Sequence, residues 1–297
     1  MELTQKINFY EKRDFGEKIN VTFAFLRQNF APLSKSILFI AGPAILLVAV
    51  VAGVYQATIM DTTASGEIDY LGILSQSSLT SFLSIFVSAL LTTVVYAYLV
   101  LYVERADYHN ITVAEVWERA KQHYLPVVVS VFVYSVLVLL GFMLLIIPGF
   151  IALAALSFIF IIQMKEGLSL GAAFSRCFKL VSDNYLSTLG LIFVISVLII
   201  IISMVVMLPF GIALGVPAFF SLTQETGPTD AEGIMKVVFV AFQALNSLLS
   251  YLLYAILLIA VAFQYANLVE KKEAAGLLES VNTIGQTNRP TRDDETY

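Results

Sequence analysis

The chain alternates long apolar windows with short polar segments. Asp, Glu, Lys and Arg are all missing from five windows, which span residues 36 to 60, 70 to 103, 122 to 164, 184 to 224 and 237 to 269. About 20 apolar residues cross the hydrocarbon core of a bilayer as a helix, so each window is long enough to cross at least once. The window from 122 to 164 would form one helix about 60 Å long and must therefore cross twice. This pattern predicts an all-α polytopic membrane protein with six transmembrane helices.

Turn signals divide the longest apolar windows. In the third window the step Pro148-Gly149 is the expected turn between two crossings. In the fourth, Pro209 opens a stretch to residue 222 that is broken by glycine and proline, and we expect it to be re-entrant or interfacial, with a further span as the alternative. The predicted helices run from about 36 to 55, 79 to 103, 125 to 147, 150 to 164 and 186 to 208, with the sixth inside 237 to 269.

Weak internal repeats relate three parts of the chain. With an offset of 61 residues, Tyr124 falls on Tyr185 and Pro148 on Pro209, and an offset of 94 places residues 27–32 on 121–126. These matches predict three related hairpins, at about 12-106, 111-168 and 169-272, each preceded by an amphipathic helix on the cytoplasmic side. Residues 1-272 would then form a single membrane domain, and residues 273-297 are expected to be a polar, disordered cytoplasmic tail.

The leading helices show apolar stripes at helical spacing. In the first, the stripe consists of Phe15, Ile19, Phe23, Leu26, Phe30 and Leu33. Such a helix is expected to lie in the membrane interface, and a groove for a soluble partner is the competing use. The second begins with Thr112 and Glu115, a capping-box pattern. In the third, the apolar side holds Leu170, Ala173, Phe174, Cys177 and Val181.

Basic residues are confined to one side of the predicted membrane, with Lys236 as the exception. The other 16 of the 17 Lys and Arg residues lie before the first span, after the second, after the fourth or after the sixth. By the positive-inside rule this places both termini in the cytoplasm. Glu104, Glu166 and Glu270 each lie where a predicted hairpin returns to the basic side. They are expected to anchor helix ends at the interface, and a catalytic or ion-binding triad is the alternative.

Composition narrows the possible functions. With 59% hydrophobic and 13% charged residues, and a mean hydropathy of +0.85, the chain is not an ordinary soluble domain. No basic cluster exceeds what membrane orientation needs, so no nucleic-acid partner is expected. Cys177, His109 and His123 have no neighbours at metal-ligand spacing, so we predict no metal, no cofactor and no catalytic residue. The spans hold no ionisable Asp, Glu, Lys or Arg, which disfavours proton-coupled transport.

Neutral polar residues do enter the second and sixth predicted spans. The candidates for a polar pocket are Thr92, Tyr96, Gln243, Asn246, Ser250 and Tyr254. Asn246, Ser250 and Tyr254 are four residues apart and share one helix face. Hydrogen bonding between helices is the expected use, because such groups must find partners inside the protein. A lining for a lipid headgroup or a small solute is the alternative.

A resemblance to a bacterial membrane family rests on three motifs. The chain reads Leu-Leu-Ile-Ile-Pro-Gly-Phe at 144–150, Lys-Glu-Gly-Leu-Ser at 165–169 and Ala-Ala-Phe-Ser-Arg-Cys-Phe-Lys-Leu at 172–180. These motifs resemble the membrane domain attached to some glycerophosphoryl diester phosphodiesterases, and related six-helix proteins. The resemblance covers about residues 111–200 and implies a bacterial cytoplasmic (inner) membrane. The catalytic barrel has no counterpart in this sequence, so phosphodiesterase activity is not implied.

These observations lead us to expect a non-enzymatic integral membrane scaffold or accessory subunit that organises partners or lipids. Its expected partners are membrane lipids and other membrane proteins. The alternative function is a facilitator or lipid-handling transporter that uses the neutral polar faces of spans two and six. An intramembrane enzyme fits least well, because paired ionisable groups are missing from the spans.

Overall fold

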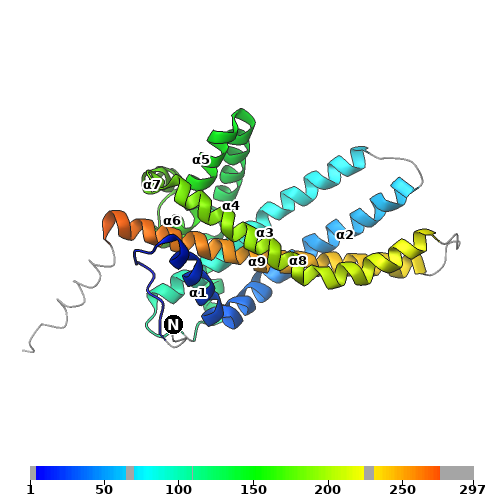
Figure 1. The fold of residues 1–297 in the computed structure, drawn as a ribbon, viewed down its shortest axis with the longest axis horizontal. Coiled ribbons are helices and arrows are strands. Elements are labelled where there is room, and N and C mark those ends of the chain that lie inside the picture. Colours follow the sequence, from blue (N-terminus) through cyan, green and yellow to red (C-terminus); the bar gives the residue numbers. More distant parts are fainter. Residues whose placement is uncertain (1–4, 65–69, 109, 224–230, 275–297) are drawn as a thin grey trace, which may run out of the picture.

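The computed structural model describes residues 5–64, 70–108, 110–223 and 231–274, and every regular element among them is a helix (Figure 1). Six helical stretches are long and apolar enough to cross a membrane. The predicted all-α class and the six helices of membrane-spanning length are therefore confirmed. The expected tail lies, apart from its first two residues, outside the described residues. In chain order the elements are α1 (Phe15–Ser36), the π-helix η1 (Ile37–Ala41), α2 (Gly42–Ala64), α3 (Tyr70–Glu104), α4 (Val113–Leu144), α5 (Ile146–Leu156), α6 (Ile159–Glu166), α7 (Leu170–Val181), α8 (Tyr185–Thr223) and α9 (Ala231–Glu273).

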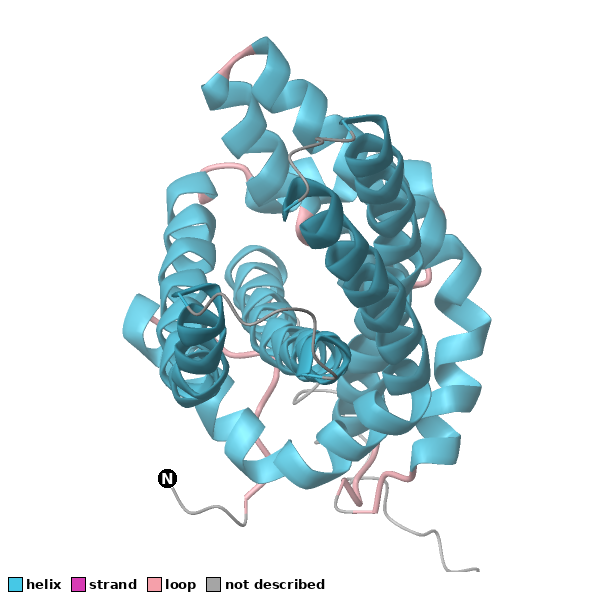
Figure 2. Ribbon diagram, turned by 90° about the vertical axis from the view of Figure 1, so that its right-hand side faces the viewer, coloured by secondary structure: helices cyan, strands magenta, loops and turns pink. Residues whose placement is uncertain are grey.

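Helix ends gather on one side of the molecule, which we call the basic end. It is formed by the starts of α1, α4 and α8, the ends of α3, α6 and α9, and the short helix α7 (Figure 1). From this end α2 and α3 project in roughly the same direction as α8 and α9, and Figure 2 looks onto their far ends. The tip formed by α4 and α5 projects separately. Because α2 packs on α9 as well as on α3, the helix pairs are interlocked.

The core beside the basic end is rich in aromatic side chains. Tyr98 and Tyr102 of α3 are fully buried, as are Phe25 of α1 and Phe263 of α9. The Phe25 ring lies edge-on to both tyrosines, with centroid distances of 6.5 and 4.9 Å, and 5.8 Å from Phe263. Edge-to-face geometry is the arrangement that aromatic quadrupoles prefer. Phe25 therefore fastens α1 to α3 and α9 from the inside.

The inner face of helix α1 combines polar and apolar side chains. Its buried face holds Lys18, Val21, Thr22, Phe25, Asn29, Leu33 and Ser36. Of the predicted apolar stripe, Phe15 and Phe30 are exposed, while Phe23 packs against the cluster between α8 and α9. The expected boundary between a leading helix and the first span does not exist, because α1 continues through η1 directly into α2. Glu17, Asn20, Arg27 and Lys35 are exposed as well, so the outer face of α1 mixes polar and apolar side chains.

Capping boxes set the starts of α1 and α4. The predicted box at α4 is confirmed: the Thr112 N–H donates to Glu115 at 2.9 Å, and the Glu115 N–H donates to the Thr112 hydroxyl at 3.4 Å. Asp14 and Glu17 form the same reciprocal pair at α1, with both bonds at 2.8 Å. Each pair satisfies two backbone N–H groups that the helix itself leaves without partners.

The chain reverses between α4 and α5 at Leu145, three residues before the predicted turn. Leu145 is extended, with φ −160° and ψ 151°, and Pro148 lies in the first turn of α5, where its missing N–H costs no hydrogen bond. Gly141 and Gly149 face each other across the turn, and a Cβ on Gly141 would lie 2.9 Å from the Gly149 Cα. A Cβ on Gly149 would lie 2.4 Å from the Phe142 ring. Two glycines thus allow the close approach that closes this helix pair.

The predicted turn at Pro209 is wrong. Helix α8 continues from Tyr185 to Thr223 through this proline, so residues 209–222 are not a separate re-entrant or interfacial segment. At the 61-residue offset, Ile202 and Phe210 stand where the α4–α5 turn has Gly141 and Gly149. Large side chains at both positions prevent the backbone approach that the glycines permit. A proline on its own removes one helical hydrogen bond, which membrane helices tolerate.

We expect Gly149→Ala to lower the free energy of unfolding by about 1–3 kcal/mol, because the new methyl group would overlap the Phe142 ring. Gly211→Ala is the matched control, since a Cβ there meets nothing within 4 Å and alanine favours a helix. Steric trapping in detergent micelles measures both variants. Adding Phe142→Ala should recover part of the loss. Equal effects at the two glycines would contradict the close contact.

Candidate functional site

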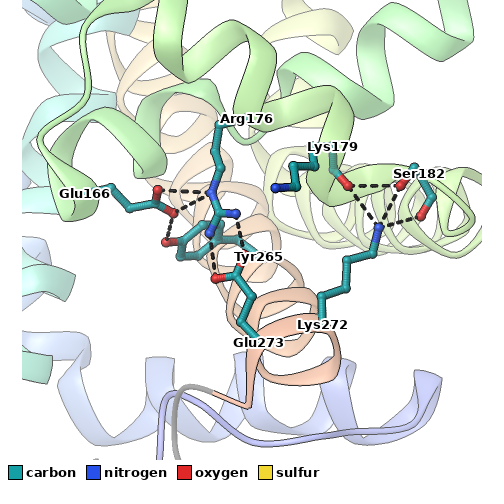
Figure 3. Close-up of polar contacts among 7 residues, drawn as sticks. All are labelled: Glu166, Arg176, Lys179, Ser182, Tyr265, Lys272 and Glu273. Atoms are coloured by element: carbon teal, nitrogen blue, oxygen red, sulfur yellow. Dashed lines mark hydrogen bonds and ion pairs between the residues drawn. The ribbon is translucent and has the colours of Figure 1, made fainter. Parts of the chain in front are cut away.

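The ion pairs of the basic end centre on Arg176, which points from α7 toward the ends of α6 and α9 (Figure 3). Its Nε donates to the two oxygens of Glu166 at 3.3 and 3.1 Å. Its Nη2 donates to Glu273 at 2.8 Å, and Nη1 binds the same carboxylate. The Tyr265 hydroxyl completes the cluster by donating to Glu166 at 2.7 Å. One guanidinium therefore joins α7 to the preceding helix α6 and to α9, which lies far away in the sequence.

This cluster is partly shielded from solvent, and its charges support one another. The Arg176 and Glu166 side chains are 18% and 23% exposed. Hydrogen bonds to Glu273 raise the pKa of Arg176 above its ordinary value. Burial acts in the opposite direction, and the hydrogen bonds to Glu166 raise the pKa further. A guanidinium matches carboxylates with paired N–H groups in a fixed plane, so the geometry is specific to arginine. The cluster is therefore a structural clamp between α6, α7 and α9.

Lys272 makes a second link between α9 and α7 (Figure 3). Its Nζ donates to the carbonyl oxygens of Lys179 and Ser182, both at 2.9 Å, and to the Ser182 hydroxyl at 2.7 Å. The last carbonyls of a helix have no partner within it and carry the negative end of its dipole. Lys272 therefore caps the end of α7 and holds it against α9.

A basic cavity lies beside this junction, between the starts of α1 and α8 and the end of α9. Its volume is about 570 Å³. Its lining combines four cationic side chains with one carboxylate, three neutral polar side chains and one aromatic ring: Lys12, Arg13, Lys18 and Lys271; Asp14; Asn184, Ser187 and Asn267; and Phe15. The lining residues of this cavity thus come from three separate helix ends. Their net charge is positive.

Hydrogen bonds to neutral groups hold two of these lysines in place. Lys18 is only 3% exposed, and its Nζ donates to the Ser187 hydroxyl at 3.1 Å. Lys271 donates to Oδ1 of Asn184 at 3.0 Å. Within the described part of the chain, neither lysine takes part in an ion pair, and their two charges repel each other. The cavity therefore holds positive charge that the neighbouring side chains do not neutralise.

The positive charge of Arg13 is better compensated than that of Lys18 or Lys271. Its guanidinium binds the Glu11 carboxylate at 2.5 Å and the Phe9 carbonyl at 3.2 Å. Burial lowers the pKa of Arg13 from its ordinary value, and Glu11 acts in the opposite direction. Its backbone N–H donates to Oδ1 of Asn267 at 2.8 Å, which ties the segment before α1 to α9. The uncompensated charge of the cavity is thus carried by its lysines.

The three predicted interfacial anchors lie in different surroundings. Glu104 pairs with Arg119 at 3.2 Å and with Lys165 at 3.6 Å. Glu166 belongs to the Arg176 cluster, and Glu270 is buried. Among the described residues, no group of three His, Cys, Asp or Glu side chains is placed to hold a metal ion. Glu104 and Glu166 thus pair with different cations, and nothing in these contacts supports the triad alternative.

The described structure buries only part of the predicted polar pocket. Thr92 and Tyr96 are buried in the core, whereas Tyr254 of α9 is exposed. Gln243 and Asn246 are half-buried, and Ser250 is exposed. The Tyr96 hydroxyl is fully buried and has no hydrogen-bond partner in the described structure. Thr92 and Tyr96 are therefore the buried members of the set, and the candidates from α9 are half-buried or exposed.

Other buried polar side chains bond from helix to helix. These bonds join Tyr98 to Asn29 at 2.9 Å, Ser130 to Gln163 at 2.7 Å, and Gln264 to Thr188 at 3.0 Å. They connect α3 to α1, α4 to α6 and α9 to α8. Hydrogen bonds between spans are the use that neutral polar groups usually find in a bilayer.

Cys177 lies on the buried side of α7, and burial raises the pKa of its thiol to about 12. A thiol with so high a pKa carries little thiolate at neutral pH and is a poor nucleophile. Cys177 therefore packs as a small apolar side chain.

Sequence reasoning missed the cavity and the Arg176 cluster. Both depend on residues from chain segments far apart in the sequence, which no single pattern connects. One local signal was available: Lys18 falls in register with Thr22, Phe25 and Asn29, at spacings of four, three and four. That register marks Lys18 as part of the inner face of its helix.

Comparison of the chain with protein-family models, with curated proteins and with solved structures finds no match. The resemblance to the phosphodiesterase-linked membrane domain therefore stays a prediction. Functional inference depends on the geometry of the described residues.

We expect Arg176→Met to lower the free energy of unfolding by roughly 1–3 kcal/mol, because Glu166 and Glu273 would lose their shared cation. Lys121→Met is the matched control. It removes an exposed pair with Glu118 and should cost less than about 1 kcal/mol. Steric trapping of both variants in the same detergent gives the comparison. A loss at Arg176 no larger than that at Lys121 would show that the cluster is not a clamp.

Proposed function

We propose that this chain is a non-enzymatic integral membrane scaffold or accessory subunit that organises membrane lipids or other membrane proteins. The observation that carries the proposal is the use of the buried polar side chains. The Tyr98–Asn29, Ser130–Gln163 and Gln264–Thr188 bonds each join two helices. Side chains that bond to each other in this way stabilise a fixed arrangement of helices.

The proposal places the protein in a bacterial cytoplasmic membrane as three related hairpins with both termini in the cytoplasm. Support comes from the charge pattern, because the clamp at Arg176 and the basic cavity lie at the end where Lys and Arg are concentrated. Positively charged segments stay on the cytoplasmic side during insertion. The scaffold would thus present its charged surface to the cytoplasm.

A second candidate function, a facilitator for lipids or small solutes, is favoured by one observation. The Tyr96 hydroxyl is fully buried and lacks a hydrogen-bond partner in the described structure. A polar group left unpaired in an apolar interior costs free energy, and a passing solute would satisfy it. Tyr96 of α3 would then lie on the path of such a solute.

Lipid transfer and stability separate these functions. Purified protein is reconstituted into vesicles that contain fluorescent phosphatidylglycerol, and dithionite bleaches the outer leaflet. A scaffold should leave about half of the label protected, as in protein-free vesicles, whereas a lipid facilitator exposes nearly all of it. Protein-dependent bleaching that disappears in Tyr96→Phe would contradict the scaffold proposal.

For a scaffold, Tyr96→Phe should raise the free energy of unfolding by about 1 kcal/mol, because it removes an unpaired buried hydroxyl. Tyr98→Phe is the matched control two residues along the same helix. It should lower stability by about 1–2 kcal/mol, because Asn29 would lose its partner. The same change in stability for both tyrosines would mean that the Tyr96 hydroxyl has a partner after all.

Thiol labelling tests the orientation. Leu145→Cys, placed at the exposed α4–α5 turn in a Cys177→Ala background, should react with an impermeant maleimide added to intact spheroplasts. Glu118→Cys, on the exposed surface of the basic end, should react only after permeabilisation. The reverse pattern would show that the basic end faces outward.

A further inference from the structure

The basic cavity holds more positive charge than its own residues neutralise. Asp14 supplies its only lining carboxylate, and that group already accepts the Glu17 N–H as the cap of α1. Arg13 is paired with Glu11. Lys18 and Lys271 bond only to neutral oxygens among the described residues. An anion from outside the chain would complete the charge balance of the cavity.

Among the lysines of the cavity, Lys18 carries the greatest free-energy cost of burying a positive charge. Its side chain is almost fully buried, and burial of a cation is unfavourable; the Asp14 carboxylate offsets only part of this cost. Lys271 adds repulsion from across the cavity. An ammonium group has three N–H donors, and the bond to Ser187 uses one of those on Lys18. Both lysines thus have donors to offer an oxyanion that lies between them.

Helix α8 strengthens the same preference. It starts at Tyr185, and both Asn184 and Ser187 line the cavity. The first backbone N–H groups of a helix have no partner within it and carry the positive end of its dipole. Negatively charged groups such as phosphate are therefore favoured beside this end of α8. Side-chain charge and backbone dipole act in the same direction here.

We infer that the basic cavity binds the phosphate group of an anionic phospholipid. The surroundings of the cavity indicate the lipid source: Phe15, which lines it, is exposed, and so is Leu186, the chain neighbour of the lining residue Ser187. From Leu186 an exposed apolar stripe continues along α8 through Phe193, Val197, Ile200, Ile201 and Met204. Acyl chains would follow this stripe while the phosphate enters the cavity. Inorganic phosphate shares the same recognising chemistry and is the other possible source.

This inference rests on the membrane placement in the proposed function and holds for a scaffold and for a facilitator alike. Its failure would leave the thiol-labelling and lipid-transfer results unchanged. The two proposals are therefore tested separately.

The test uses the full-length protein in detergent micelles with three probes: dioleoylphosphatidylglycerol, dioleoylphosphatidylcholine and inorganic phosphate. Native mass spectrometry measures lipid binding, and thermal unfolding measures stabilisation. The test variants are Lys271→Gln and the double variant Lys18→Gln/Lys271→Gln. Lys35→Gln/Lys121→Gln is the matched control, because it removes two exposed charges outside the cavity.

Wild type and control should bind phosphatidylglycerol at least about tenfold more tightly than phosphatidylcholine. Lys271→Gln should weaken phosphatidylglycerol binding by roughly tenfold, and the double variant should weaken it further. Without lipid, the double variant should unfold at the same temperature as wild type or higher, because the repulsion between the lysines is gone. This expectation keeps loss of binding distinct from loss of folding.

Stabilisation by inorganic phosphate that is lost in the double variant, together with competition against phosphatidylglycerol, would support the anion site with free phosphate as the source. No effect of inorganic phosphate, with lipid binding lost in the variants, would support the headgroup. The inference is overturned if the double variant binds both probes as wild type does, or if phosphatidylcholine binds as tightly as phosphatidylglycerol.

Discussion

A polar group inside a bilayer has no water to bond, so its partner must come from the protein, and this constraint organises the whole chain. It explains why α1 carries Asn29 on its inner face and leaves Phe30 outside. Asn29 lies inward because Tyr98 is there to bind it, and Gln264 meets Thr188 between α9 and α8 in the same way. The positions of these partners decide how the apolar helices, which would otherwise pack in many ways, are aligned with one another.

The basic end contains one cluster of paired charges and one cavity lined by lysines without ion-pair partners among the described residues. At Arg176 two carboxylates and one guanidinium neutralise each other, and the result is a fixed junction between α6, α7 and α9. Beside this junction, Lys18 and Lys271 line the basic cavity. Neither lysine has an ion-pair partner among the described residues. Neutralised charge fixes helices in place, whereas uncompensated charge attracts an outside ion. The difference separates the structural part of this end from the part that is suited to binding.

The lengths of the helix pairs follow from where the backbone is able to turn. Gly141 and Gly149 let α4 and α5 approach closely enough to close a short pair. Ile202 and Phe210 take their places in the related segment, and α8 continues to Thr223, about 58 Å in all. This is roughly twice the thickness of the bilayer core. In Figure 1, α8 and α9 project in a different direction from the α4–α5 tip. Small side chains, more than prolines, therefore determine the outline of the molecule.

The sequence by itself determined the all-α class, the six helices of membrane-spanning length and the capping box at Thr112, because each depends on residues close together in the chain. It misplaced the turn near Pro148 and predicted one at Pro209 that does not exist, since a turn needs room on the facing helix as well as a local signal. Only the tertiary structure decided that Thr92 and Tyr96 are buried while Ser250 and Tyr254 are exposed. It alone brought Lys18, Asn184 and Lys271 to one cavity, because contacts between distant helices depend on packing that local periodicity does not encode.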